Sequence, residues 1–269
     1  MQSLSARIFS LLSAVLLAAS FLLRFFSIVH NLSETANIVL YALIAIGLSM
    51  ITVSAIKEND YLSAFNFNNN KKMSIASYAA SAGFFINFVH QCVVIYQSVE
   101  NGEFKAFSFF VPACLACLSA LLSCFYFFTI GMSYSDNGYD FRKLKVLHIV
   151  PVLWAIANVL AVMTVAVSPL KDAGKVMKFA MLVCAVAFFY FLAVEIENKK
   201  GAKKATVLFS KAFSYLALMF FADRVMLLLS RDVVISDSDS VFSLVVIMIA
   251  VFAFFFQKDI IKNSIIKGA

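Results

Sequence analysis

The sequence predicts an all-α fold, in which a polytopic membrane protein forms one bundle of eight transmembrane helices with both termini in the cytoplasm. Three observations predict it: eight long apolar stretches, few charged residues, and a one-sided distribution of lysine and arginine. A helix of roughly 17–25 mostly apolar residues spans the ~30 Å hydrocarbon core, and in lipid only a helix pairs all its backbone groups within one segment. The expected spans are residues 8–30, 36–56, 73–97, 106–131, 146–168, 176–196, 207–230 and 240–257.

The composition points to lipid surroundings. Of the 269 residues, 62% are hydrophobic and 14% are charged, whereas an ordinary globular domain has about 25% charged residues. Thirty Phe residues beside one Trp suit a lipid-facing surface. A net charge of +7 would suggest nucleic acid in a soluble protein, but basic loops that fix orientation explain it better here. The expected partner is therefore the lipid bilayer, with no nucleic acid.

Lysine and arginine collect in alternate connections. One side of the bilayer would hold fourteen of the 22, namely Arg7, Lys57, Lys71, Lys72, Arg142, Lys143, Lys145, Lys199, Lys200, Lys203, Lys204, Lys258, Lys262 and Lys267. The other side would hold five, namely Lys105, Lys171, Lys175, Lys178 and Arg231. Basic residues favour the cytoplasmic side, so both termini are expected there, which requires an even number of spans. The expected location is the cell (plasma) membrane, with a multi-pass topology.

The first span is predicted to be an uncleaved helix with a polar stripe. A signal peptide has an apolar region of ~7–15 residues, whereas the run after Arg7 continues to Val29. At 100° per residue, its polar residues fall within an arc of about 100°. They are Ser10, Ser13, Ser20, Arg24, Ser27 and Asn31. Such a stripe should face protein or water, so Arg24 is expected to point into the bundle.

The third and fifth spans also carry polar stripes. In the third span the stripe comprises Ser77, Ser81, Asn87 and Gln91, with His90 just past its edge. In the fifth span it comprises His148, Pro151, Trp154 and Asn158. We therefore expect the first, third and fifth helices to be the inner ones. His148 lies at the cytoplasmic boundary, where a headgroup contact is the favoured interpretation.

The remaining spans offer less chemistry. Cys114-x-x-Cys117 in the fourth resembles a metal or redox pair, but no second pair or adjacent His accompanies it, and packing as a small hydrophobe is favoured. No metal site or cofactor is therefore predicted. Glu195 at the end of the sixth span is expected in a solvated cluster, and Lys211 is expected to reach the headgroups. The eighth span is apolar on all sides, which predicts a peripheral, lipid-facing position.

Charged residues deep in the spans form a predicted polar layer. Arg24, His90, Asp223 and Arg224 lie six or seven residues before the outer ends of their helices, roughly 9–11 Å below the surface. Intramembrane charges are by default site candidates. The candidate ligand-binding residues are Arg24, Asn87, His90, Gln91, Asn158, Asp223 and Arg224. No residue is a candidate for catalysis.

Asp223 needs a partner on another helix. Asp223 and Arg224 are rotated ~100° apart, so they cannot pair well along one helix. Arg24 lies at matching depth and is the expected partner. Two interpretations stay open: a structural salt bridge between helices, or a cavity in which His90 and the arginines bind a small anion. The second predicts that His90 shares a water-accessible outer pocket with the Arg24–Asp223 pair.

Two stretches of the C-terminal half carry a resemblance: the run from Leu147 to Ala155 (LHIVPVLWA), and the Phe-rich sixth span, which ends Glu195-Ile196-Glu197-Asn198. Over roughly this half, the chain resembles a group of uncharacterised multi-pass membrane proteins of Gram-positive bacteria. The resemblance implies a membrane bundle and no particular activity.

A single transmembrane domain is predicted over residues 1–269. A tandem repeat of four helices, 1–133 and 144–269, is suggested by polar residues at matching depth in the third and seventh spans, although Phe-rich helices also match by chance. An even-numbered repeat of this kind would be parallel.

The sequence favours transport or substrate binding over enzymatic function. It contains no Gly-x-x-x-x-Gly-Lys, His-Glu-x-x-His or Gly-x-Ser-x-Gly motif. The first hypothesis is small-solute transport or membrane substrate binding through an outward-facing polar cavity, with a partner subunit or ion gradient supplying energy. The alternative is a membrane sensor, scaffold or assembly partner with purely structural charges. A third is an intramembrane enzyme that uses His90 and Asp223 as acid and base.

Overall fold

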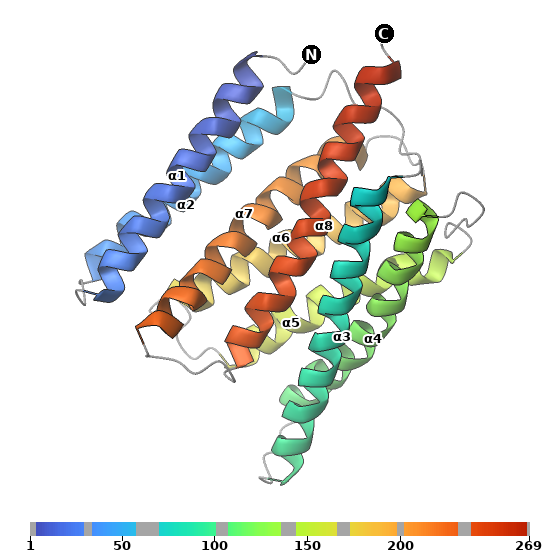
Figure 1. The fold of residues 1–269 in the computed structure, drawn as a ribbon. Coiled ribbons are helices and arrows are strands. Elements are labelled where there is room, and N and C mark those ends of the chain that lie inside the picture. Colours follow the sequence, from blue (N-terminus) through green and yellow to red (C-terminus); the bar gives the residue numbers. More distant parts are fainter. Residues whose placement is uncertain are drawn as a thin grey trace.

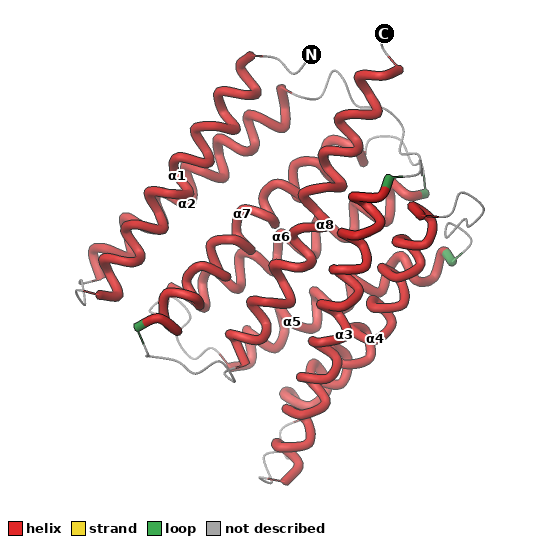
Figure 2. The backbone as a smooth tube through the Cα atoms, viewed as in Figure 1, coloured by secondary structure: helices red, strands yellow, loops and turns green. Residues whose placement is uncertain are grey.

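The computed structural model describes residues 4–29, 34–57, 70–100, 107–135, 144–165, 173–197, 202–230 and 238–267. In these residues the chain forms eight α-helices and one short 3-10 helix over Lys145–Ile149 (Figures 1 and 2). All eight are long and apolar enough to cross a membrane, which confirms the predicted fold class. They are α1 (Leu4–Val29), α2 (Glu34–Lys57), α3 (Lys71–Glu100), α4 (Phe107–Ser135), α5 (Val150–Val165), α6 (Ala173–Ile196), α7 (Ala202–Leu229) and α8 (Ser238–Lys267).

The helices alternate in direction through the bundle. The start of α1 and the end of α8 consequently lie at the same end, which we call the terminal end (Figure 1). The opposite end, where α3, α5 and α7 finish, is called the distal end. The assignment of the terminal end to the cytoplasm stays a prediction from the distribution of basic residues.

The eighth helix is the most buried of the eight described spans and keeps one exposed face at Leu244, Val251 and Phe254, so the expectation of a peripheral α8 was wrong. It packs on α3 and α7, and Val245, Ile249, Phe252 and Phe256 are buried. A helix that is apolar on all sides suits a bundle interior as well as a lipid-facing position, because lipid tails are as apolar as a protein core. Hydropathy alone therefore could not choose between the two positions.

The first helix lies at the edge, which corrects the expectation that it is an inner helix. It packs on α2 and α7, and Leu11, Val15 and Leu22 are exposed along its outer face. Its polar stripe still faces protein, since Ser13 and Ser20 are buried. A polar stripe thus identifies the side of a helix that contacts protein, and leaves its place in the bundle open.

An aromatic cluster joins five helices in the core. The Phe84 ring of α3 lies edge-on to Trp154 of α5 at 4.9 Å and stacks on Phe127 of α4 at 5.2 Å, measured between ring centroids. Phe189 of α6 and Phe242 of α8 pack on Trp154 at 6.2 and 5.9 Å. Aromatic pairs of this geometry are worth about 0.5–1.5 kcal/mol beyond their buried area. The packing of this cluster positions the helices that carry the polar residues of the distal end.

Two polar residues near the terminal end are deeper than expected. Glu195 is buried instead of belonging to a solvated cluster. His148 is also buried, and its ring packs edge-on against Tyr126 at 5.6 Å, so the headgroup contact expected for it was wrong. The physical reason is that α6 and the 3-10 helix pack on each other at this end and enclose both side chains.

Candidate functional site

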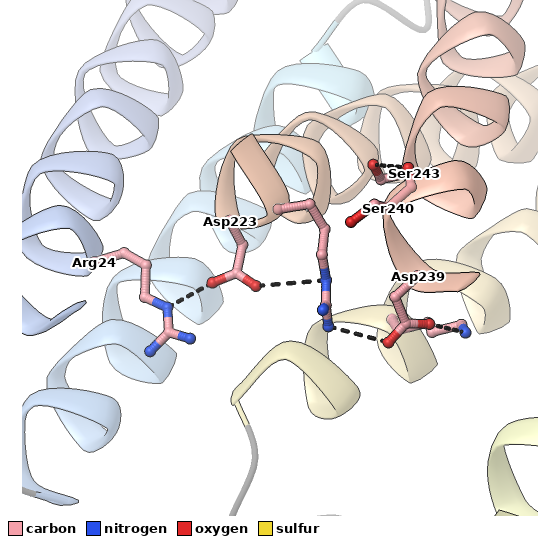
Figure 3. A network of polar contacts seen from close by, with 7 residues as sticks. Arg24, Asp223, Asp239, Ser240 and Ser243 are labelled. Carbon is pink, nitrogen blue, oxygen red and sulfur yellow. Dashed lines mark hydrogen bonds and ion pairs between the residues drawn. The ribbon is translucent and has the colours of Figure 1, made fainter. Parts of the chain in front are cut away.

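The predicted ion pair between the first and seventh helices is present. Arg24 Nε of α1 donates to Asp223 Oδ1 of α7 at 2.6 Å (Figure 3). The Asp223 side chain is 1% exposed, so the pair lies inside the bundle. Shared depth and the polar stripe of α1 were sufficient to predict this contact, and the structure confirms it.

The ion pair continues into a chain of alternating charges. Asp223 Oδ2 lies 4.0 Å from Arg224 Nε, and Arg224 Nη2 lies 3.1 Å from Asp239 Oδ2 at the start of α8. Asp239 Oδ1 in turn accepts a hydrogen bond from Lys178 Nζ of α6 at 2.5 Å. Arg24, Asp223, Arg224, Asp239 and Lys178, here called the charge chain, therefore link α1, α7, α8 and α6. Figure 3 shows Asp223 between Arg24 and the segment that carries Asp239.

The sequence did not single out Asp239 and Lys178 as site residues. Asp239 lies one residue before the predicted eighth span, and Lys178 was assigned to the outer surface by the distribution of basic residues. The available signal was Arg224, which needed an acidic partner at its own depth once Asp223 had been assigned to Arg24. Asp239 is the acidic residue in the first turn of α8.

A cavity of about 250 Å³ lies at the distal end, among α3, α4, α5, α6 and α8. Its polar lining comprises His90, Gln91, Asn158, Lys175, Lys178, Ser238 and Asp239. Ala113 and Ala116 of α4 leave room for it, because their side chains are small. His90 Nε2 lies 3.0 Å from Ser238 Oγ, and Asn158 Nδ2 donates to the Trp154 carbonyl at 2.8 Å. These bonds fix both side chains within the wall.

The seven candidate residues divide into three groups. His90, Gln91 and Asn158 come together in the cavity. Arg24, Asp223 and Arg224 belong to the charge chain and are not in the cavity lining. The expectation of one pocket shared by His90 and the Arg24–Asp223 pair was therefore wrong. The reason is that equal depth places residues at one level of the membrane without fixing their positions within that level. Arg24 lies on α1, which packs on α2 and α7, whereas the cavity lies on the α3 side of α8.

The third group is Asn87, which is bonded within the core. Its Oδ1 accepts a hydrogen bond from Trp154 Nε1 at 2.8 Å, and both residues are fully buried. An indole N–H is a donor only, so burial of this Trp requires an acceptor. Asn87 thus anchors the aromatic cluster beneath the cavity.

The Asn87–Trp154 bond makes a testable prediction. In Asn87→Leu the buried indole N–H loses its acceptor, which we expect to cost about 1–3 kcal/mol. A thermal unfolding series should show the loss, and the emission of Trp154, the single tryptophan, should shift. The double variant with Trp154→Phe should be less destabilised than the sum of the two single changes. Strictly additive losses would contradict the bond.

The cavity carries more basic than acidic charge. Among its described lining residues, Lys175 and Lys178 face one carboxylate, Asp239. That carboxylate is shared by Lys178 and Arg224. In a site of low dielectric such an excess attracts anions, with amide and imidazole groups nearby to hydrogen-bond them. Over the described part of the chain, no group of three or more His, Cys, Asp or Glu side chains could hold a metal ion.

Comparison with known proteins gives no relative. No family model matches the chain, and no curated protein or solved structure matches it either. The eight apolar helices and the geometry at the distal end therefore carry the functional argument.

Proposed function

We propose that this protein binds a small anionic solute in the cavity at the distal end, as a transporter or as a membrane subunit that delivers a substrate. The observation that carries the proposal is the lining of the cavity by Lys175, Lys178 and His90 together with the neutral polar groups Gln91 and Asn158. Recognition sites commonly combine apolar walls with a few convergent polar groups. Here Ala113, Val162 and Phe242 supply the apolar part.

The charge chain also supports the proposed site, because two of its basic residues position Asp239. Arg224 and Lys178 both bond to Asp239, which holds this carboxylate at the edge of the cavity. With its charge largely balanced, Asp239 repels an incoming anion less than an unpaired carboxylate would. The distal end is the expected outer face, so the cavity would accept solute from outside the cell. Transport would then require an ion gradient or a partner subunit.

A thermal-shift screen of the purified protein tests the proposal. Sodium salts of phosphate, sulfate, acetate and other small anions are compared at constant ionic strength, with chloride salts of small organic cations as the control series. A ligand at about a hundred times its Kd stabilises a protein by about 2.7 kcal/mol, so at least one anion should raise the apparent Tm by several degrees. Uptake of that anion into proteoliposomes then distinguishes a transporter from a binding subunit.

Variants locate the binding. Lys175→Gln and His90→Gln should reduce the anion-dependent shift, whereas Lys72→Gln, an exposed lysine at the terminal end, should leave it unchanged. Absence of any anion effect, or an equal effect in all three variants, would contradict the proposal.

A second candidate function rests on the charge chain itself. Arg24, Asp223 and Arg224 join helices without lining the cavity, which is the arrangement expected of structural charges in a membrane sensor, scaffold or assembly partner. Under this function, cavity variants would be as stable as the wild type and no small anion would stabilise either.

A further inference from the structure

We infer that Cys92 of α3 and Cys117 of α4 are a site of reversible disulfide formation at the distal end of the bundle. Their Sγ atoms lie 3.5 Å apart, so the two thiols are in direct contact between the helices. The sequence suggested Cys114 as the neighbour of Cys117, but the thiol that contacts Cys117 comes from another helix. The inference concerns the thiols themselves and does not rest on the proposed function.

The packing of α3 on α4 brings the two thiols close to bonding distance. The helices lie side by side (Figure 1). Ser74 Oγ of α3 donates to the Gly131 carbonyl of α4 at 3.0 Å, and Ser81 Oγ donates to the Cys124 carbonyl at 2.9 Å. A disulfide bond is about 2.05 Å long, so the two Sγ atoms must approach each other by about 1.5 Å. Helices shift by about 1–2 Å in many small rearrangements, and side-chain rotation adds to this range.

Cys92 lies near the boundary of the membrane at the distal end. Helix α3 has 30 residues and is about 45 Å long, which exceeds the ~30 Å hydrocarbon core. Cys92 lies about 32 Å along this helix from Lys71 at its start. A second observation agrees, because His90 Nε2 lies 3.0 Å from Ser238 Oγ at the start of α8, and Cys92 follows His90 toward the distal end. A thiol at this level can meet a water-soluble reagent.

The exposures of the two thiols differ, and this difference assigns each thiol a step. Cys92 is exposed, on the same face of α3 as the exposed residues Val89 and Tyr96. Cys117 is 8% exposed and contacts Cys92. Disulfide exchange requires one thiol that a reagent reaches first and a second thiol that can attack the mixed disulfide. Cys92 is therefore the attacking thiol and Cys117 the resolving thiol.

The oxidant in this reaction is a disulfide compound. The Cys92 thiolate attacks one sulfur of that compound, which forms a mixed disulfide and releases the first thiol. The Cys117 thiolate then attacks the Cys92 sulfur, which forms the bond between the two cysteines and releases the second thiol. Two electrons pass from the protein to the oxidant, and the two protons lost by the cysteines end on the released thiols. An excess of thiol reverses both steps.

The bond would join α3 to α4 at the level of the distal cavity. Gln91 and Ala116, the residues directly before the two cysteines, line that cavity. Oxidation would therefore fix the separation of two helices in the cavity wall. The distal end is the expected outer face, and disulfides persist outside the cytoplasm, where thiols are not kept reduced.

The test uses the detergent-purified full chain, which is first reduced and then incubated with oxidised glutathione. The remaining thiols are alkylated after denaturation and counted by mass spectrometry. Two of the five cysteines should escape alkylation, their peptides should be recovered as a crosslink of Cys92 with Cys117, and dithiothreitol should restore all five. The oxidised chain should also melt several degrees higher than the reduced chain, because a disulfide restricts the unfolded state. Five free thiols after oxidation, or a lower apparent Tm of the crosslinked chain, would overturn the inference.

Variants assign the two roles. Cys117→Ala removes the resolving thiol, so Cys92 should keep one glutathione as a stable mixed disulfide. Cys92→Ser removes the accessible thiol, so Cys117 should stay largely unmodified. Cys114→Ala, the matched control about one turn away on α4, should form the bond as the wild type does. If Cys114→Ala loses the bond and Cys92→Ser still forms one, the two cysteines of α4 are the site and the inference is wrong. The crosslink in the wild-type chain decides the question even if a variant does not fold.

Discussion

Asp223→Asn is expected to destabilise the bundle by about 2 kcal/mol. Breaking a buried ion pair typically costs about 3–5 kcal/mol of stability, whereas a polar contact between helices in a membrane typically contributes about 0.6–1.7 kcal/mol, and the expected value lies between these ranges. Asp223 is 2% exposed and lies between Arg24 at 2.6 Å and Arg224 at 4.0 Å. The neutral amide leaves two guanidinium groups without the anion between them. The apparent Tm in detergent should fall, and Glu100→Gln, an exposed carboxylate at the end of α3, should leave it unchanged.

A double variant separates this pair from general damage. Arg24→Gln combined with Asp223→Asn removes both charges of the α1–α7 contact, and should be more stable than Asp223→Asn alone. The recovery should be partial, because Arg224 still lacks the contribution of Asp223. If the double variant loses the full sum of the two single losses, the ion pair does not hold α1 against α7.

Gly83→Leu should have the other large effect, because Gly83 of α3 lies directly against the backbone of α8. A Cβ atom at this position would lie 3.2 Å from the Val245 carbonyl oxygen and 3.2 Å from Met248 Cβ. Small residues permit such close helix contacts in membranes. A leucine must push the two backbones apart, and overpacking typically costs about 1–3 kcal/mol.

The consequence of Gly83→Leu should extend beyond the contact itself. Phe84 follows directly and packs on Trp154, so separation of α3 from α8 should also shift the emission of this tryptophan. Gly83→Ala should be mild, since its Cβ is tolerated by a displacement of a few tenths of an ångström. Phe85→Leu, on the exposed face of α3, serves as a control. A leucine variant as stable as the alanine variant would argue against the close α3–α8 packing.

Local patterns predicted the spans and one specific contact. Apolar runs of span length can only be helices in lipid, so all eight were accessible from sequence. The Arg24–Asp223 contact could be predicted from the depth of each residue in its span and from the side of the helix on which it lies. Both can be determined from the sequence of a single helix. The membrane orientation and the tandem repeat of two four-helix halves remain predictions.

Lateral arrangement could not be predicted, for a physical reason. The interior position of α8 leaves no signature in a helix that is apolar throughout, since lipid and protein core offer it similar surroundings. Asp239 and Lys178 lie at the ends of helices, where a charge is usually solvated, so their bond was not apparent. Asn87 was grouped with Gln91 because they share a face, but one turn of helix separates the aromatic core from the cavity.

Accessibility of the cavity in intact cells is the most direct test of an outward-facing anion site. In a background with the five native cysteines replaced, Gln91→Cys and Asn87→Cys differ by one turn of α3, and only Gln91 lines the cavity. We predict that a membrane-impermeant thiol reagent bearing a sulfonate group, added outside the cells, labels Gln91→Cys. It should label this variant faster than the corresponding reagent bearing an ammonium group does. It should leave Asn87→Cys and Ser10→Cys unlabelled. Labelling of Ser10→Cys from outside, protection of Gln91→Cys, or a preference for the cationic reagent would contradict an outward-facing cavity that selects anions.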